Sequence, residues 1–247
     1  MNKPLKKKPD AAKAARSRRS AIGRQPKRMA AREAVVDAGK LSVRERILEV
    51  AERLFAEHGR SGVGLRAISS EAKVNLASIA YHFGSKEGLL EELFSLRAAP
   101  IADARIRLLD DAEATYGGAA PLEVIIEAFI RPALIIGPQS PAGGEAFGRL
   151  RARLATEPEK FSRRILSKAF DKSSRRFIEA LVKALPGLPR VQVEWRFHFM
   201  LGTMYYTMAN SGRIQVLSDQ RCDPGNVEFA LKHMVPFLAA GFRSTPL

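Results

Sequence analysis

Cysteine is nearly absent from the chain, which contains Cys222 and no other cysteine in 247 residues. A single cysteine cannot form an intrachain disulfide, so the sequence predicts a fold suited to a reducing, cytoplasmic environment. Long apolar runs are lacking too, because no stretch approaches the length that spans a bilayer. No apolar segment follows the basic N-terminus, so we expect no secretory signal there. These absences predict a protein that is neither exported nor bound to a membrane.

Catalytic and metal-binding motifs are also lacking. The four histidines, His58, His82, His198 and His233, have no metal-ligand spacing, and neither a GxSxG motif nor a P-loop occurs. His198 follows Glu194 by one helical turn, but such a pair is more often structural than catalytic. The sequence therefore predicts no metal, no cofactor and no enzymatic activity.

Acidic residues are scarce relative to basic ones, and the formal net charge is +15. A surplus of cations favours polyanionic partners such as nucleic acid. Residues 1–40 contain thirteen Lys or Arg, three acids and few large apolar side chains. Such a segment cannot bury enough surface to offset its ordering entropy, so we expect a mostly disordered basic arm. Two interpretations stay open: an arm that follows phosphates or enters a minor groove, and a solvated extension without contacts.

Beyond the basic arm, apolar residues recur at helical spacing and no convincing period-2 alternation appears, so the predicted fold class is all-α. The pattern divides into a compact unit over residues 41–100 and a larger helical domain over residues 101–247. In the larger domain the sequence predicts helices near residues 121–136, 158–185, 191–209 and 225–240. Prolines such as Pro100 punctuate the helical pattern, and Pro132 is expected to end or kink a helix.

The first predicted helix of the compact unit has clear boundary signals. Ser42 is a suitable N-cap, and Glu45 stands three residues later as its capping-box partner. Gly59 is a natural C-terminal residue for this helix, because glycine adopts a left-handed conformation without strain.

Residues 65–83 (LRAISSEAKVNLASIAYHF) predict two short helices joined by a tight turn. The first helix directs Leu65, Ile68 and Ala72 inward and leaves an outer set of Arg66, Ser69, Ser70 and Glu71. Asn75 has the right chemistry to cap the second helix. The second helix directs Leu76, Ile79 and Phe83 inward and leaves an outer set of Ala77, Ser78, Tyr81 and His82. The arrangement is that of a helix-turn-helix.

The outer set of the second helix suits contact with DNA. A recognition helix presents its N-terminal residues to base edges in the major groove. Ser78 can hydrogen-bond to bases, and Ala77 can contact a thymine methyl. Tyr81 and His82 are longer and suit phosphates, and Lys86 at the start of the next helix can bind another phosphate. The alternative is a helix pair that never touches DNA, with His82 a packed surface histidine and Tyr81 a core aromatic.

The segments ILEVAERLFAEHG and LRAISSEAKVNLASIAYHFGSKEGLLEELF resemble the N-terminal domain of the TetR family of bacterial regulators. The resemblance implies a three-helix DNA-binding domain over residues 41–100 and an effector-binding and dimerisation domain over residues 101–247. It implies that phosphates are contacted by Tyr81, His82 and Lys86, and that bases are read by the segment from Asn75 to Ser78. The full predicted DNA-binding set is Arg66, Lys73, Asn75, Leu76, Ala77, Ser78, Tyr81, His82 and Lys86.

Two residues depart from the family pattern. Lys73 stands in the turn where the family has glycine, and a lysine held in a left-handed conformation costs on the order of 1 kcal/mol. Lys73 also offers an additional phosphate contact. Gly64 stands where a Ser or Thr cap is usual, and glycine is a tolerated but weaker choice.

The C-terminal part predicts a dimer and an effector site. In the TetR family the last two long helices pair with those of a second subunit, which implies a homodimer on double-stranded operator DNA. The segments EWRFHFMLG and MVPFLAAGFR resemble the fatty-acid-responsive repressors of β-oxidation genes, which implies a fatty acid or its CoA thioester as effector. A different apolar or aromatic compound, with efflux or catabolic control, stays open.

The candidate effector residues are apolar or basic side chains of the larger domain. They are Phe129, Arg131, Phe147, Arg149, Phe170, Trp195, Phe199, Met200, Met204 and Tyr205. The apolar ones suit a cavity with few polar anchors, although such residues are more often plain core. The two arginines could pair with an acyl carboxylate or could be surface charges, and the basic residues of the 158–185 helix are expected to form a solvated face. The predicted function is a ligand-released repressor, and the alternative is a non-specific architectural DNA-binding protein.

Overall fold

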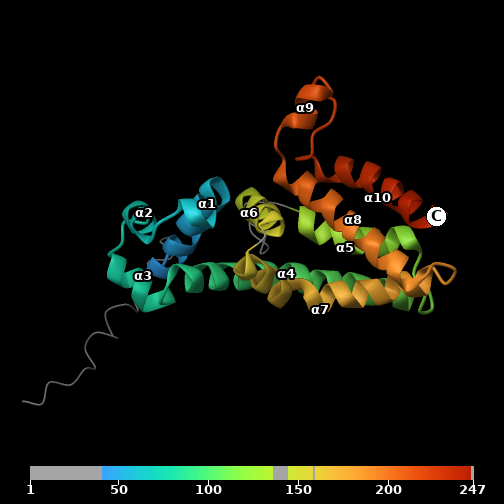
Figure 1. Cartoon of the computed structure of the whole chain (residues 1–247), viewed down its shortest axis with the longest axis horizontal. Helices are drawn as coiled ribbons and strands as arrows, with labels where there is room; N and C mark the ends of the chain where they lie inside the picture. Colours follow the sequence, from blue (N-terminus) through green and yellow to red (C-terminus); the bar gives the residue numbers. More distant parts are fainter. Residues whose placement is uncertain (1–40, 136–143, 158, 246–247) are drawn as a thin grey trace, which may run out of the picture. The chain divides into compact units, whose positions relative to one another are not determined.

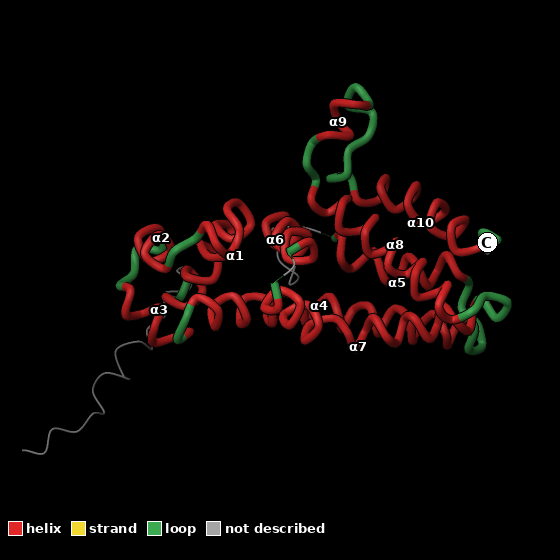
Figure 2. Tube along the Cα trace, viewed as in Figure 1, coloured by secondary structure: helices red, strands yellow, loops and turns green. Residues whose placement is uncertain are grey.

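The computed structural model describes residues 41–135, 144–157 and 159–245, and these residues form ten helices and no strand (Figures 1 and 2). The helices are α1 (Val43–Gly62), α2 (Leu65–Glu71), α3 (Leu76–Phe83), α4 (Lys86–Thr115), α5 (Leu122–Leu134), α6 (Glu145–Thr156), α7 (Lys160–Ala184), α8 (Arg190–Ala209), α9 (Arg213–Leu217) and α10 (Val227–Arg243). The all-α prediction is confirmed. The expectation for the basic arm concerns residues 1–40, which lie outside the described residues.

Helix α1 begins as its sequence predicts. The Ser42 hydroxyl accepts a hydrogen bond from the Glu45 amide at 3.2 Å, and the Glu45 carboxylate accepts one from the Ser42 amide at 2.8 Å. Gly59 has a φ of 71° and interrupts the helix, but one further helical stretch continues to Gly62. Gly59 therefore has the expected left-handed conformation, but the expectation that the helix ends there is wrong, because α1 ends at Gly62.

Helices α1 to α4 share one apolar core at the N-terminal end of the described chain. Ile47 and Phe55 of α1 are fully buried, as are Ile68 of α2, Ile79 of α3 and Leu89 of α4. Because α2 and α3 are too short to be stable alone, this packing holds them in place. The α2–α3 pair is thereby fixed against α1 and the start of α4.

Helix α4 continues through Pro100, so this proline does not separate two helices as its place in the sequence pattern indicates. Proline removes one helical hydrogen bond, and packing must compensate for it. Ala98 and Ile101 on either side are almost completely buried, so tertiary contacts offset the loss. Pro132 also lies inside a helix, but α5 ends two residues later at Leu134.

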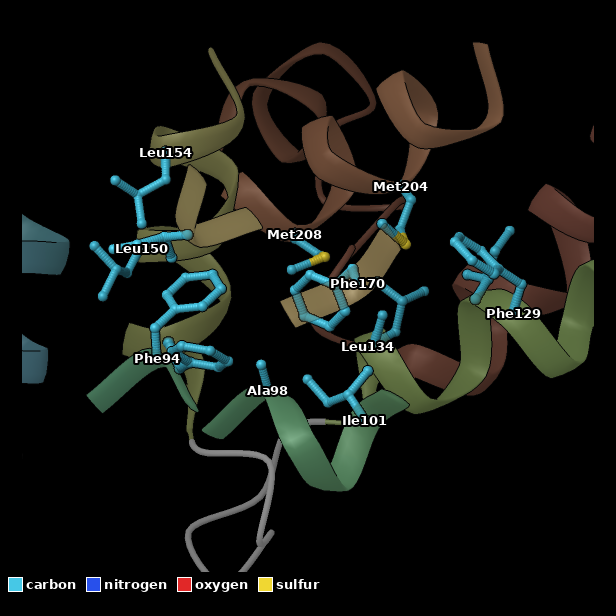
Figure 3. Packing of buried hydrophobic residues seen from close by; sticks show 14 of the residues in the cluster. Phe94, Ala98, Ile101, Phe129, Leu134, Leu150, Leu154, Phe170, Met204 and Met208 are labelled. Carbon is cyan, nitrogen blue, oxygen red and sulfur yellow. The ribbon is translucent and has the colours of Figure 1, made fainter. Parts of the chain in front are cut away.

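The core of the larger part lies among α4, α5, α6, α7 and α8. Figure 3 shows side chains from these helices converging, with Phe94 and Ile101 of α4 near Phe170 of α7. Phe94 meets Phe147 of α6 edge to face, with ring centroids 5.1 Å apart. Such pairs combine apolar burial with a favourable quadrupole geometry.

Ion pairs connect α5 with α10 and α4 with α7 on the outside of this core. Arg131 of α5 bonds to Glu228 of α10 at 3.1 Å, and Arg243 of α10 bonds to Glu123 of α5 at 2.8 Å. On α7, Arg176 bonds to Glu113 of α4. The expectation of a fully solvated basic face on α7 is therefore wrong in part, because some of its arginines bind acids of α4. Within the described ranges, no helix combines the length and the apolar character needed to cross a membrane.

Candidate nucleic-acid interface and internal cavity

The turn between α2 and α3 has the geometry that its sequence predicts. Lys73 has a φ of 54°, in the left-handed region that favours glycine. The Val74 amide donates to the Ser69 carbonyl at 3.0 Å and closes the turn. The Asn75 side chain then accepts from the Ala77 amide at 2.9 Å and caps α3. Short-range hydrogen bonds thus set the angle at which α3 leaves the turn.

Most of the predicted DNA-binding side chains are accessible. Tyr81 is 86% exposed, and Arg66, Lys73, Asn75 and Ala77 are exposed as well. Ser78 and His82 are half-buried, and the rings of His82 and Tyr81 meet edge to face with centroids 5.1 Å apart. Glu71, the acid next to this surface in the sequence, is paired with Arg53 of α1. The surface therefore offers cations, a phenol and small polar groups to a polyanion.

Two side chains of this segment lie opposite to their predicted side. Leu76 was expected inward, but it is 40% exposed, because it belongs to the first turn of α3 and the core is reached only at Ile79. Ser69 was expected outward, but it is buried and its hydroxyl donates to the Arg66 carbonyl at 3.0 Å. Leu76 thereby adds an apolar contact to the exposed start of α3.

Lys86 has a structural role that sequence reasoning missed. Its Nζ donates to the carbonyls of Arg60 at 3.0 Å and Val63 at 3.1 Å. These carbonyls lie at the end of α1, so the ammonium ties the start of α4 to the loop before α2. An ammonium has three donors, which leaves one for another acceptor. No signal in the sequence distinguishes this lysine from one that only meets solvent.

A half-open cavity of about 750 Å³, bordered by exposed residues such as Arg153 and Tyr206, lies among α1, α4, α6, α7 and α8. Arg149, Phe170 and Tyr205 from the predicted effector set line it. Ala56 of α1 and Arg105 of α4 line it as well, and neither was predicted. The volume is in the range of sites that hold small organic ligands.

The other predicted effector residues do not line this cavity. Phe129, Phe147, Met200 and Met204 are core residues with at most 1% of their surface exposed. Trp195 and Phe199 are more than half exposed on α8 of the single chain. Arg131 is held by Glu127 and Glu228, which leaves it as an ion-pair residue between α5 and α10.

Two buried arginines were missed. Arg105 and Arg151 are each 1% exposed. Burial and the nearby Arg151 guanidinium lower the pKa of Arg105 to about 9. Burial also lowers the pKa of Arg151, while the neighbouring Tyr205 hydroxyl opposes the shift. A signal did exist, because Arg105 falls four residues after Ile101 and four before Leu109, within the buried stripe of α4.

No group of three or more His, Cys, Asp or Glu side chains suited to a metal ion occurs in the described part of the chain. His198 lines the cavity, and Glu194 one turn earlier is bound by Arg190. Cys222 is exposed.

A short helix pair with an accessible second helix, followed by a helical domain with a cavity, defines a helix-turn-helix regulator. Residues 47–93 match the bacterial regulatory proteins of the tetR family, and residues 127–241 match the tetracyclin repressor-like C-terminal domain. The chain belongs to the TetR family of DNA-binding transcriptional regulators, which are not enzymes.

Curated relatives match parts of the chain. RaaS, a transcriptional regulatory protein of Mycobacterium tuberculosis, is 34% identical over 49% of this chain and 56% of its own length. AcnR, a transcriptional repressor of Corynebacterium glutamicum, is 40% identical over 24% of this chain and 32% of its own length. The chain thus spans about half or less of the length of these relatives.

Solved structures share the fold at low identity. HlyIIR, a haemolysin II transcriptional regulator, superposes with a TM-score of 0.55 at 19% identity over 82% of this chain and 98% of that one. FadR from Bacillus halodurans, a fatty acid degradation regulator, superposes with a TM-score of 0.52 at 18% identity over 83% and 99%. These likenesses support the fold of the C-terminal domain and leave its ligand open.

Proposed function

We propose that the protein is a homodimeric repressor that binds operator DNA through α3 and is released by an apolar effector in the cavity. The observation that carries the proposal is that α1 contributes both to the cavity and to the packing of the helix-turn-helix. Ala56 of α1 lines the cavity, and α1 also packs against α2 and α3. A ligand in the cavity therefore contacts the same helix that supports the recognition helix.

The proposed DNA-binding residues fall into two groups according to the length of their side chains and their position on α3. Asn75, Leu76, Ala77 and Ser78 start α3 and read base edges, because the N-terminal end of a recognition helix enters the major groove. The backbone is held by the longer or charged side chains Arg66, Lys73, Tyr81, His82 and Lys86. The third donor of the Lys86 ammonium supplies its phosphate contact.

Exposed apolar residues support the dimer. Val191, Trp195 and Phe199 are more than half exposed and follow one another at four-residue spacing along α8. Phe237 on α10 is 67% exposed. An apolar surface of this kind is typical of an interface, and a twofold dimer would cover it with the same surface of a second copy.

Release follows from a population shift. A ligand that binds the DNA-incompetent arrangement of α1 more tightly than the competent one moves the population away from DNA. The cavity suits a fatty acid or acyl-CoA, and FadR from Bacillus subtilis, whose structure holds stearoyl-CoA, has a related fold with a TM-score of 0.51 at 16% identity. An aromatic or other apolar compound is the second candidate. As a regulator of bacterial genes, the protein acts on the chromosome in the cytoplasm.

Selection of bound duplexes from a random DNA pool tests the proposal. We expect an enriched pseudo-palindrome whose half-sites lie about one helical turn, roughly 34–36 Å, apart. The same selection with residues 1–40 deleted should give the same sequence. If no sequence is enriched, if random DNA competes equally, and if the deletion abolishes binding, the protein is a non-specific architectural DNA-binding protein instead.

A further inference from the structure

Two buried guanidinium groups lie in or beside the cavity, and among the described residues no carboxylate pairs with either of them. Arg105 and Arg151 are each 1% exposed. A charge removed from water is costly unless a counter-charge or several hydrogen bonds compensate for it. Two such charges side by side also repel each other, so the free protein is destabilised at this place.

The contacts of these two side chains are incomplete. Arg105 Nε donates to the Phe129 carbonyl at 2.7 Å, and its Nη2 lies 3.4 Å from the Met204 sulfur, a weak acceptor. Arg151 Nη1 lies 3.5 Å from the Ala133 carbonyl, while its Nε and Nη2 have no partner among the described residues. No carboxylate of the described chain lies within 4.0 Å of either guanidinium. Residues 136–143 contain no Asp or Glu in the sequence.

The two guanidiniums face the same aromatic ring. The Phe170 centroid is 5.4 Å from the Arg105 guanidinium carbon and 4.9 Å from that of Arg151. Phe170 and Arg105 both line the cavity, whereas Arg151 contacts the Phe170 ring without lining the cavity. A ligand in the cavity can therefore contact Arg105 directly, and the charge of Arg151 attracts an anionic ligand over a longer distance.

The rest of the lining adds to the positive potential. Arg149 and Arg153 line the cavity, and Asp171 is the one acid among its lining residues. Arg149 is already paired with Glu145 at 2.7 Å, and Arg153 donates to the Glu57 carbonyl at 3.3 Å. Arg105 is thus the buried cation of the described lining. Its partners are the Phe129 carbonyl, the Met204 sulfur and the Phe129 ring 3.7 Å away, and no carboxylate of the described residues is among them.

We propose that the effector is an apolar monocarboxylic acid whose carboxylate binds Arg105, with the charge of Arg151, which lies over the same Phe170 ring, reinforcing the site. This inference rests on the proposed function, because it names the chemical class of the effector. The carboxylate provides the missing counter-charge, and a charge-assisted hydrogen bond to a guanidinium that is only 1% exposed is stronger than one in water. The apolar part lies along Leu166, Leu201 and the Phe170 ring, which line the same cavity.

A free acid fits this site better than a CoA thioester. A thioester has no charge at the acyl carbonyl, so it cannot neutralise Arg105 there. The charges of CoA lie on its nucleotide and pyrophosphate, away from the thioester, so they offer no counter-charge at the position of the acyl carbonyl. The site therefore selects for the free carboxylate.

Calorimetric titration of the full-length protein in the absence of DNA tests the proposal with three probes of one chain length. These are dodecanoate, dodecan-1-ol and dodecanoyl-CoA. We expect dodecanoate to bind at least about tenfold more tightly than the other two, which corresponds to one charge-assisted hydrogen bond. Equal affinity for the acid and the alcohol, tighter binding of the CoA thioester, or no binding of dodecanoate overturns the proposal.

Variants test the residues. Arg105→Met should lose the preference for dodecanoate over dodecan-1-ol, and Arg151→Met should reduce it. Arg105→Lys should keep part of it, because the charge is retained. Arg163→Met, which removes an exposed arginine of α7, should leave it unchanged. Both Met variants at the buried positions should also melt at a higher temperature than the wild type without ligand, because they remove an uncompensated buried charge.

The outcomes separate this inference from the proposed function. If the wild type selects a pseudo-palindromic operator but shows no preference for dodecanoate over dodecan-1-ol, the inference is wrong and the regulator remains. If dodecanoate binds through Arg105 but no operator is selected, the acid site stands and the repressor function fails. A Met variant that unfolds would contradict the inference as well, because it would show that the arginine stabilises the free protein.

Discussion

Lys73 is a residue that the local geometry disfavours. It holds a φ of 54°, where a side chain with a Cβ is strained. We expect Lys73→Gly to raise the free energy of unfolding by about 0.5–1 kcal/mol, measured by urea denaturation. Lys73→Ala is the matched control, because it removes the ammonium but keeps the Cβ. Equal stability of the Gly and Ala variants would contradict the strain.

Tyr81 and Ser78 separate affinity from sequence preference. Tyr81 is 86% exposed, so Tyr81→Ala should not affect folding. It should weaken binding to every duplex to a similar degree, and Ser78→Ala should change the preferred base at one position of each half-site. Anisotropy titrations on operator variants measure both effects. Tyr116→Ala, at an exposed tyrosine after α4, should change neither, and an unaltered affinity of Tyr81→Ala would contradict the docking.

At the scale of single residues, the sequence predicts conformation best where neighbouring residues in the chain determine it. The capping box of Ser42, the cap at Asn75 and the left-handed Lys73 depend on atoms within three or four residues, so the pattern alone predicts them. The exposure of Leu76 and the hydrogen-bond partners of Lys86 depend on how the helices pack against one another, which no local pattern encodes. Their exposure and partners therefore required the structure.

At the scale of elements, Lys86 connects two helices that the sequence treats as separate. Lys86→Met would leave the Arg60 and Val63 carbonyls without their donor. We expect a loss of about 1–2 kcal/mol in the free energy of unfolding and faster hydrogen exchange in the loop before α2. Lys172→Met, at an exposed lysine of α7, should do neither. Normal exchange in the Lys86 variant would show that the two bonds are not formed in solution.

The α5–α10 pair should be sensitive to acid. Hydrogen bonds from Arg243 and Arg131 lower the pKa of Glu123 and Glu228, respectively, below the ordinary value of 4.5. A lowered pKa in the folded state gives stability that is present above 4.5 and is lost as the pH falls through the folded value.

The double variant Glu123→Gln/Glu228→Gln should therefore lose less stability than the wild type between about pH 6 and about pH 3. Thermal melts over this range measure the difference. Glu49→Gln, at an exposed glutamate of α1, is the control and should follow the wild type. Identical acid profiles of wild type and double variant would contradict a role for these ion pairs.

Element boundaries were predicted well where apolar spacing was strong, as for α7 and α8, which begin and end within two residues of the expected limits. The prediction at Pro100 was wrong, because sequence rules for proline describe an isolated helix. In α4, the residues on both sides of Pro100 are buried against other helices, and this packing keeps the helix continuous. The buried arginines were missed because arginine is ordinarily a surface residue. Their position in the apolar stripes was the available signal.

At the scale of the whole molecule, the exposed face of α8 should decide the oligomeric state. Trp195→Glu/Phe199→Glu places two negative charges on the proposed interface. We expect a folded monomer by light scattering, with operator affinity greatly reduced, because a single half-site contact remains. Tyr116→Glu should remain a dimer. If the double variant stays dimeric, the subunits associate through another surface.

The wall formed by Ala56 has a consequence for how effectors of different size act. Arg153, also in the wall, donates to the Glu57 carbonyl and lies 3.0 Å from where a Cβ on Gly59 would be, so α1 and α6 meet closely there. If the acid extends toward Ala56, a short chain stops before α1, whereas a longer one presses against it. The regulator would then distinguish acids by chain length, and the affinity of an acid would be a separate property from its ability to release the protein from DNA. The acid that binds best need not be the acid that switches the genes on.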